Sequence, residues 1–215
     1  VFIPYNADCI GVFNPATDAF SCVDITSVMT FNYKFWGGVV TSSGLVVFTP
    51  FQADCIGVFN PTTNAFSCVD ISSVITIANK FVDEVLTSSG LVVFTPHNAD
   101  CIGVFNPTTN AFSCIDISSV ITTDSKFAGG VVTSGGIIVF TPINTDCVGL
   151  FNPATSAFSC IDISATNNQN TKFRGGGVVT SGGIVVFAPY HADCVGLFDP
   201  TTNAFSCVDI SSIMT

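Results

Sequence analysis

One sequence motif recurs five times along the chain at a nearly constant spacing. An Asn-Pro or Asp-Pro pair follows Val-Phe or Leu-Phe in every copy, at residues 14, 60, 106, 152 and 199, so the spacings are 46, 46, 46 and 47 residues. A fixed period of this length indicates a repeat architecture, in which each copy is one supersecondary unit that packs on its neighbours. The fold of one repeat therefore determines the fold of the whole chain.

Each repeat consists of short apolar runs separated by turn residues. A complete copy reads KFWGGVVTSSG, LVVFTPFQAD, CIGVFNPTTN and AFSCVDISS, and each run is rich in β-branched or aromatic residues and ends near Gly, Pro or Asn. These are strand and turn signals. No segment has a long apolar period of 3.6 residues, so no helix is expected. We predict four antiparallel strands in each complete repeat.

Four antiparallel strands in a repeat of this length are typical of a β-propeller blade. The elements KFxGGV, VFTPxNAD and NPTTN resemble YVTN/NHL-type propeller repeats, and particularly tandem repeats of protist and algal type. This resemblance covers essentially the whole chain and implies a fold rather than an activity. We predict an all-β protein, a ring-shaped five-bladed β-propeller of four-stranded antiparallel blades, forming a single domain of residues 1–215 with repeats at approximately 1–33, 34–79, 80–125, 126–171 and 172–215.

The strand that opens the repeat occurs only four times. It begins at Lys34, Lys80, Lys126 and Lys172, so nineteen strands are expected where five complete repeats would have twenty. This strand is innermost in blades of this type, and the first blade is therefore predicted to lack its innermost strand. An unpaired strand edge is a template for pairing. Three explanations are open: flanking sequence supplies the strand, a neighbouring molecule donates it, or the blade keeps three strands.

The ten cysteines occur as two in each repeat, always 13 residues apart. An even number in register indicates disulfides and an oxidising compartment, and no C-x₂₋₄-C cluster suggests a zinc site. Bonds within repeats, bonds between neighbouring repeats and buried free thiols are all compatible with the spacing. We favour bonds within repeats. The candidate pairs are Cys9/Cys22, Cys55/Cys68, Cys101/Cys114, Cys147/Cys160 and Cys194/Cys207.

Composition narrows the function classes. Only 9% of the residues are charged, five of them cationic, and the formal net charge is −10. Nucleic acid is therefore not an expected partner, and no apolar run approaches the length of a membrane span. Either neutral polar side chains cover the surface, or other protein covers part of it. Together with the cysteines, this predicts an extracellular or cell-surface protein.

Two series of aspartates recur with the repeat. The series of Asp8, Asp54, Asp100, Asp146 and Asp193 precedes the first cysteine of each repeat, and a second series ends the last strand. The first series could bind Ca²⁺ or accept backbone N–H groups of its own turn, and we favour the turn. The Lys of each opening strand is expected to pair with one of these series. No metal site and no cofactor are predicted.

Departures from the repeat are better candidates for activity. Directly after the Lys-Phe pair, one opening strand has Trp36, the next has Val82-Asp83-Glu84, and the last has Arg174 with one extra glycine, which predicts a β-bulge. Because opening strands line the channel, Trp36, Asp83, Glu84, Ala128 and Arg174 are expected at one mouth. The alternatives are a salt bridge of Arg174 with Asp83 or Glu84, or simple drift.

A second variable position lies before the first aspartate series. It holds an aromatic or apolar residue followed in most repeats by an amide, a combination suited to sugar stacking and hydrogen bonding. The alternative is a variable surface loop. The residues are Tyr5-Asn6, Phe51-Gln52, His97-Asn98, Ile143-Asn144 and Tyr190-His191, of which Tyr5, His97, Tyr190 and His191 are the main ligand-binding candidates.

Three functions are compatible with these patterns. The favoured one is a non-catalytic extracellular structural module that associates with copies of itself or with flanking repeats, as in a filament. The second is a propeller that binds a glycan or a peptide at one rim. The third is an enzyme using Asp83, Glu84 and Arg174. We predict no catalytic residues, because only one repeat supplies carboxylates to the channel.

Overall fold

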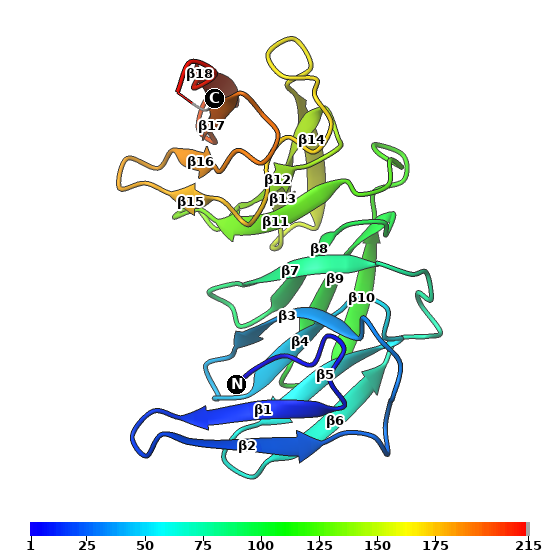
Figure 1. The fold of residues 1–215 in the computed structure, drawn as a ribbon. Coiled ribbons are helices and arrows are strands. Elements are labelled where there is room, and N and C mark those ends of the chain that lie inside the picture. The colour runs from blue at the N-terminus through cyan, green and yellow to red at the C-terminus, as the bar shows by residue number, and fades with distance from the viewer. Residues whose placement is uncertain (214–215) are drawn as a thin grey trace.

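The computed structural model describes residues 1–213 and consists of β-strands joined by turns. Five sheets follow one another along an arc (Figure 1). In order, they contain β1 (Cys9–Asn14) and β2 (Ala19–Asp24); β3 (Phe35–Val40), β4 (Val46–Pro50), β5 (Cys55–Asn60) and β6 (Ala65–Asp70); β7 (Phe81–Leu86), β8 (Val92–Pro96), β9 (Cys101–Asn106) and β10 (Ala111–Asp116); β11 (Phe127–Val132), β12 (Ile138–Pro142), β13 (Cys147–Asn152) and β14 (Ala157–Asp162); and β15 (Val178–Val179), β16 (Val185–Phe187), β17 (Cys194–Asp199) and β18 (Ala204–Asp209).

Each four-stranded sheet is an antiparallel meander in chain order. The opening strands β3, β7 and β11 pack against one another, and β15 continues the series, so they form the inner edge of the arc. The last strands β6, β10, β14 and β18 lie on the outside (Figure 1). The predicted all-β propeller fold with one blade per repeat is confirmed.

The turn between the third and fourth strands of each repeat is held by its Asn or Asp. In the second blade, Asn60 Oδ1 accepts the N–H of Thr62 at 2.9 Å, and Asn64 has a left-handed backbone with φ of 56°. Asn tolerates this conformation better than most residues. The turn sets the register in which Asn60 pairs with Ala65.

That register places the cysteines of one repeat close together. Cys55 pairs with Asp70, and Cys68 pairs with Gly57, so the two cysteines lie diagonally on one face of the hairpin, with their Cα atoms 5.4 Å apart. All ten cysteines form bonds of this kind, which confirms disulfides within repeats. The bonds are Cys9–Cys22, Cys55–Cys68, Cys101–Cys114, Cys147–Cys160 and Cys194–Cys207.

The core lies between the blades, and each blade has two unlike faces. One face carries phenylalanines and the disulfide, and packs on the preceding blade. The other carries aliphatic side chains, and packs on the following blade. Between the second and third blades, for example, Ile56 and Ile71 meet Phe94 and Phe105. The same arrangement recurs at all four junctions.

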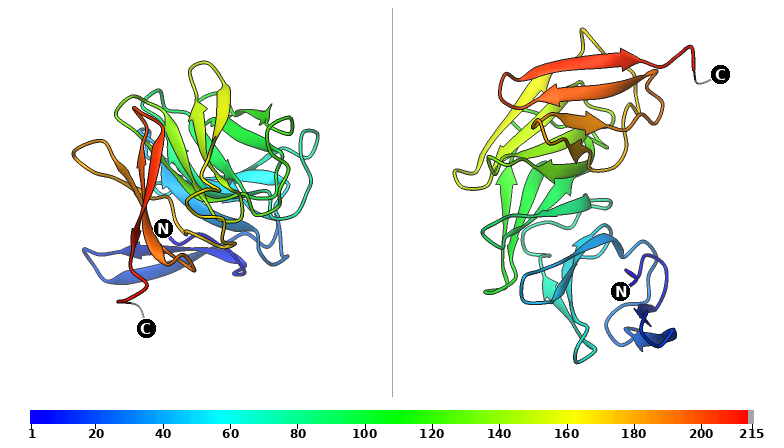
Figure 2. Two further views of the ribbon diagram at one scale, coloured as in Figure 1. Left: turned by 90° about the horizontal axis from the view of Figure 1, so that it is seen from above. Right: turned by 90° about the vertical axis from the view of Figure 1, so that its left-hand side faces the viewer.

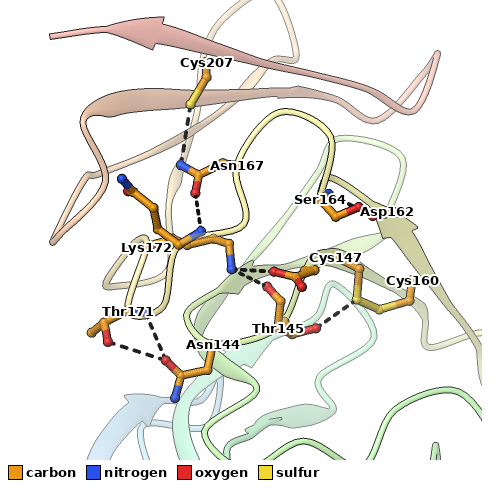
Figure 3. A network of polar contacts seen from close by, with 12 residues as sticks. Asn144, Thr145, Cys147, Cys160, Asp162, Ser164, Asn167, Thr171, Lys172 and Cys207 are labelled. Carbon is orange, nitrogen blue, oxygen red and sulfur yellow. Dashed lines mark hydrogen bonds and ion pairs between the residues drawn. A yellow bond between two sulfur atoms is a disulfide. The ribbon is translucent and has the colours of Figure 1, made fainter. Parts of the chain in front are cut away.

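At each junction, a buried lysine forms an ion pair with an aspartate of the preceding repeat. The ammonium of Lys172 contacts Asp146 Oδ1 at 2.9 Å and the carbonyl oxygen of Thr145 at 3.1 Å (Figure 3). Beside it, Asn144 Oδ1 accepts the N–H of Thr171. Lys34, Lys80 and Lys126 make the same ion pair with the aspartate of the preceding repeat.

The two aspartate series therefore have different roles. The first series holds the lysines and does not accept N–H groups of its own turn, so the favoured expectation for it was wrong. The second series accepts N–H groups instead. Asp116 Oδ1 accepts the N–H of Ser118 at 2.8 Å, and this bond lowers the pKa of the carboxyl group. Asp24, Asp70, Asp162 and Asp209 make the equivalent bond.

Two further expectations require correction. Residues 1–213 contain eighteen strands instead of nineteen, because the first repeat keeps only a single bridge between Phe2 and Gly11 in place of its second strand. This segment has no opening strand on its other side to pair with. The blades also do not close into a ring. β17 and β18 lie at one end of an arc and β1 and β2 at the other, as Figure 1 and the right-hand view of Figure 2 show.

The extra glycine shortens the opening strand of the fifth blade. A bulge interrupts the pairing of β3, β7 and β11 with their neighbours. In the fifth blade, Gly175 and Gly177 both have positive φ, and only Val178–Val179 remain as strand. Glycine adopts positive φ without a steric penalty. The predicted bulge is therefore a break of the strand in this blade.

Within residues 1–213, no helix has the length and apolarity needed to cross a bilayer.

Candidate functional site

A cavity of about 500 Å³ opens at one end of the inner strands. Four of its lining residues occupy the same position of successive repeats, directly after the Lys-Phe pair. Further lining residues come from the loops that follow the second strands, from two residues that directly precede a Lys, and from neighbouring positions of the opening segments. The lining includes Trp36, Val82, Ala128 and Arg174 from the first group, His97, Ile143, Asn144 and Tyr190 from the second, and Ser125 and Thr171 from the third.

Asp83 forms part of the cavity wall in a conformation that is unusual for a residue with a side chain. Its φ is 57°, and its Oδ2 accepts the N–H of Gly130 from the next blade at 3.1 Å. Ideal Cβ atoms at Gly129 and Gly176 would lie 2.5 and 3.0 Å from this oxygen, so glycines from the fourth and fifth blades make room for it. Burial raises the pKa of the carboxyl group. A strained, buried carboxylate is a frequent feature of functional sites.

Glu84 points away from the cavity, toward the second blade. The bulge in β7 turns the two adjacent carboxylates apart, and the hydroxyl of Thr49 donates a short hydrogen bond to Glu84 Oε2. An ideal Cβ at Gly37 would lie 2.8 Å from that oxygen. Burial, with a smaller contribution from Asp83, raises the pKa of Glu84 to about 7. Glu84 fills a space between blades and does not line the cavity.

His97 contributes a neutral ring to the wall. Burial, and then the nearby charge of Lys126, lowers its pKa to about 4. Its Nδ1 is buried and has no hydrogen-bond partner. Buried polar atoms are rarely left unpaired, so this nitrogen is an exception among the described side chains.

Aromatic side chains form one side of the opening. Trp36 lies 4.9 Å from Phe51 and 5.5 Å from Tyr5, measured between ring centroids. Phe51 continues this cluster to His97 at 6.2 Å. Tyr5 lines a separate shallow hollow of about 240 Å³ with Trp36, outside the main cavity.

Arg174 lies on the opposite side. Its guanidinium is 4.9 Å from the centroid of the Tyr190 ring. Within residues 1–213 the only ion pairs are those of the four lysines, so Arg174 makes no salt bridge with Asp83 or Glu84. His191 stacks on Tyr190, with ring centroids 4.4 Å apart, but does not line the cavity. Arg174 and Tyr190 thus present a planar cation and a ring.

The structure brings together five of the eight ligand-binding candidates: Trp36, Asp83, His97, Arg174 and Tyr190. The other three candidates do not line the cavity. They are Tyr5, Glu84 and His191. Among the residues that sequence reasoning missed are Ser125 and Thr171, which directly precede a lysine. Their signal was variation at that position, which holds Tyr33 and Asn79 in the other repeats and has positive φ in all four.

The cavity combines hydrogen-bonding groups with aromatic walls. One carboxylate, one guanidinium, a neutral imidazole, an amide and two hydroxyls line the cavity and can contact a polar ligand, and Trp36 and Tyr190 add aromatic rings to its wall. No group of three or more His, Cys, Asp or Glu side chains suited to a metal ion occurs among the described residues.

No protein-family model matches the chain, and no curated protein matches its sequence. Solved structures similar to it include virginiamycin B lyase from Staphylococcus aureus, with 15% identity and a TM-score of 0.72, covering 95% of this chain and 64% of the lyase. A streptogramin B lyase has 18% identity and a TM-score of 0.73, covering 96% of this chain and 63% of the lyase.

An auxiliary nutrient binding protein from Bacteroides thetaiotaomicron has 11% identity and a TM-score of 0.56, covering 96% of this chain and 55% of that one. This chain therefore spans less than two thirds of the length of each of these three structures. At these identities, the likeness shows the fold alone. The chain has a β-propeller fold.

Proposed function

We propose that this protein is a non-catalytic binding propeller that holds a glycan in the cavity at one end of its inner strands. The observation that carries the proposal is the convergence of Trp36, Asp83, His97, Arg174 and Tyr190, all departures from the repeat, on one cavity of about 500 Å³. Structural residues of a repeat protein recur with the repeat, as the lysines and cysteines do. Residues that differ between repeats and still meet are better explained by a ligand.

The lining favours a neutral polyhydroxylated ligand. Sugars offer apolar faces that stack on aromatic rings and hydroxyls that pair with amides, carboxylates and imidazoles. Trp36 and Tyr190 supply rings, and Asp83, Asn144 and the imidazole of His97 supply hydrogen-bonding groups. A peptide is the alternative ligand, because Arg174 could receive a carboxylate.

We also propose that the protein has no catalytic activity. The two adjacent carboxylates point apart, Asp83 toward the cavity and Glu84 toward Thr49. Acid–base hydrolysis of a glycosidic bond uses two carboxyl groups facing the same bond. Only one carboxyl group lines this cavity.

An oligosaccharide array followed by titration calorimetry tests the proposal. We expect a selective signal that Trp36→Ala and Tyr190→Ala each reduce at least tenfold. The matched control is Phe31→Ala, because Phe31 is also an exposed aromatic residue but does not line the cavity. If no array member binds, or if Phe31→Ala weakens binding as much as Trp36→Ala, the proposal is wrong.

The second candidate function is a module that associates with other protein, either copies of itself or flanking repeats, in a surface or filament assembly. The observation that favours it is the open arc, whose two end blades each leave one packing face uncovered (Figure 2). Light scattering across a concentration series tests self-association. A single monomer mass at all concentrations would exclude it.

Two finer assignments belong with these proposals. We propose a secreted or surface location, because five disulfides persist only in an oxidising compartment. We also propose that the repeats are of the YVTN/NHL type and of protist or algal origin, on the strength of the KFxGGV and NPTTN elements.

A further inference from the structure

The first blade exposes the face that its counterparts bury. Phe13 is 43% exposed, whereas the equivalent Phe59, Phe105, Phe151 and Phe198 are fully buried against the preceding blade. Phe2 and Phe20 lie on the same face and are also exposed. In the other blades, phenylalanines at these positions meet the aliphatic face of a neighbour. The first blade therefore presents one half of the interface between blades.

The fifth blade presents the other half. Val195 and Ile210 are partly exposed, whereas Ile56 and Ile71, at the equivalent positions of the second blade, are buried. Val208, on the same face, is 51% exposed. The two ends of the arc are thus the two complementary sides of an interface that the chain builds four times internally.

The fifth blade also has the aspartate of this ion pair without its lysine. Asp193 corresponds to Asp8, Asp54, Asp100 and Asp146, each of which holds a buried ammonium. The contact made by Asp193 is with the amide of Gln169, which donates to Oδ2 at 3.2 Å. Among residues 1–213, no cation pairs with this carboxylate.

We propose that the opening of the arc is occupied by a partner segment made of further repeats of this same type. Its first strand begins with Lys-Phe and places the ammonium on Asp193, its first blade covers Val195 and Ile210, and its last strand pairs with the segment around Phe2. About two repeats fit the difference in length, since the chain spans 64% and 63% of the two lyases whose fold it shares.

A second copy of this chain meets these requirements less well. Its Phe13 face could cover the fifth blade, but all four of its lysines are already buried on their own aspartates. The second copy therefore has no opening strand whose lysine is free to pair with Asp193. The inference does not depend on the cavity, and it deepens the second candidate function by naming the partner.

An extended chain tests this partner directly. A copy of residues 77–179 is appended after Thr215, which adds two repeats and one opening strand and places the next lysine ten positions after Asp209, the spacing of Asp24 and Lys34. We expect a monomer whose Tm is at least about 5 °C above that of the original chain. Asp193→Asn should lower the Tm of the extended chain by several degrees, and that of the original chain by less than about 1 °C.

Two results would overturn the inference. One is an extended chain with no gain in Tm, or with the same response to Asp193→Asn as the original chain. The other is an original chain that dimerises through these ends, so that Phe13→Asp returns it to monomer, because a second copy would then be the partner. Light scattering of the original chain tests the assembly function separately, so failure of self-association leaves the named partner intact.

Discussion

At the scale of single residues, each of the four lysines between blades is completely buried and ion-paired with an aspartate. Each ammonium is inaccessible to solvent, while the carboxylate that it contacts is about half exposed, at 51% for Asp100. The carboxylate therefore keeps much of its hydration, and the lysine depends on its partners. Removing the carboxylate from such a pair is destabilising, because the buried charge then loses its partner.

Asp100→Asn should lower the free energy of unfolding by about 1–2 kcal/mol, because it leaves the buried ammonium of Lys126 without a carboxylate 2.8 Å away. The matched variant is Asp193→Asn, which changes the same repeat position where no lysine is held, and which should cost less than about 0.5 kcal/mol. Urea denaturation measures both. Equal losses of unfolding free energy in the two variants would contradict the role assigned to the Lys126–Asp100 ion pair.

Glu84 makes stability depend on pH. Burial raises its pKa from 4.5 to about 7, so between these values the folded protein keeps a proton that the unfolded chain releases. Raising the pH through this window therefore favours unfolding, by about 3 kcal/mol in total. Glu84→Gln should remove this slope and be more stable than the parent at pH 8. Identical pH profiles for parent and variant would show that Glu84 does not titrate in this window.

At the scale of elements, most of the architecture could be predicted from the sequence, because every strand is short, apolar and ended by a turn residue. The regular spacing of the cysteines also favoured bonds within repeats, and the structure confirms them. The missing second strand of the first blade was not predicted, because Phe2 carries the same local signals as Phe48. Its pairing depends on a neighbour that the local sequence does not reveal.

The site was predictable only in part, for a related reason. Trp36 and Arg174 share one repeat position, so their convergence follows from the repeat. The separation of Asp83 from Glu84 depends on the φ of 57° at Asp83, which local sequence does not indicate, since Gly37 and Gly129 stand at the same position without a positive φ.

The hairpin disulfides should stabilise each blade separately. Replacing both Cys101 and Cys114 by Ser opens a loop with 13 residues of sequence separation and should cost about 3 kcal/mol. Thermal denaturation under non-reducing conditions measures the loss. The control is the parent protein with a reductant, which should lose more, since all five bonds open. A double variant as stable as the parent would contradict this role.

At the scale of the whole molecule, one repeated interface accounts for both the stability and the openness of the arc. Because the two faces of each blade differ, the phenylalanine face of one blade always packs on the aliphatic face of the blade before it. Each end of the arc therefore keeps one uncovered half of that interface. The candidate site lies at the inner edge, where equivalent positions of different repeats meet. Variation between repeats can therefore build a site without disturbing the framework.

The most direct test of the binding function is a crystal structure of the protein soaked with the oligosaccharide that binds most tightly on the array. We predict density for a sugar between Trp36 and Tyr190, with hydroxyls within hydrogen-bond distance of the side chains of Asp83 and Asn144. Density for the sugar on an outer surface of the blades, with this cavity holding only water, would contradict it.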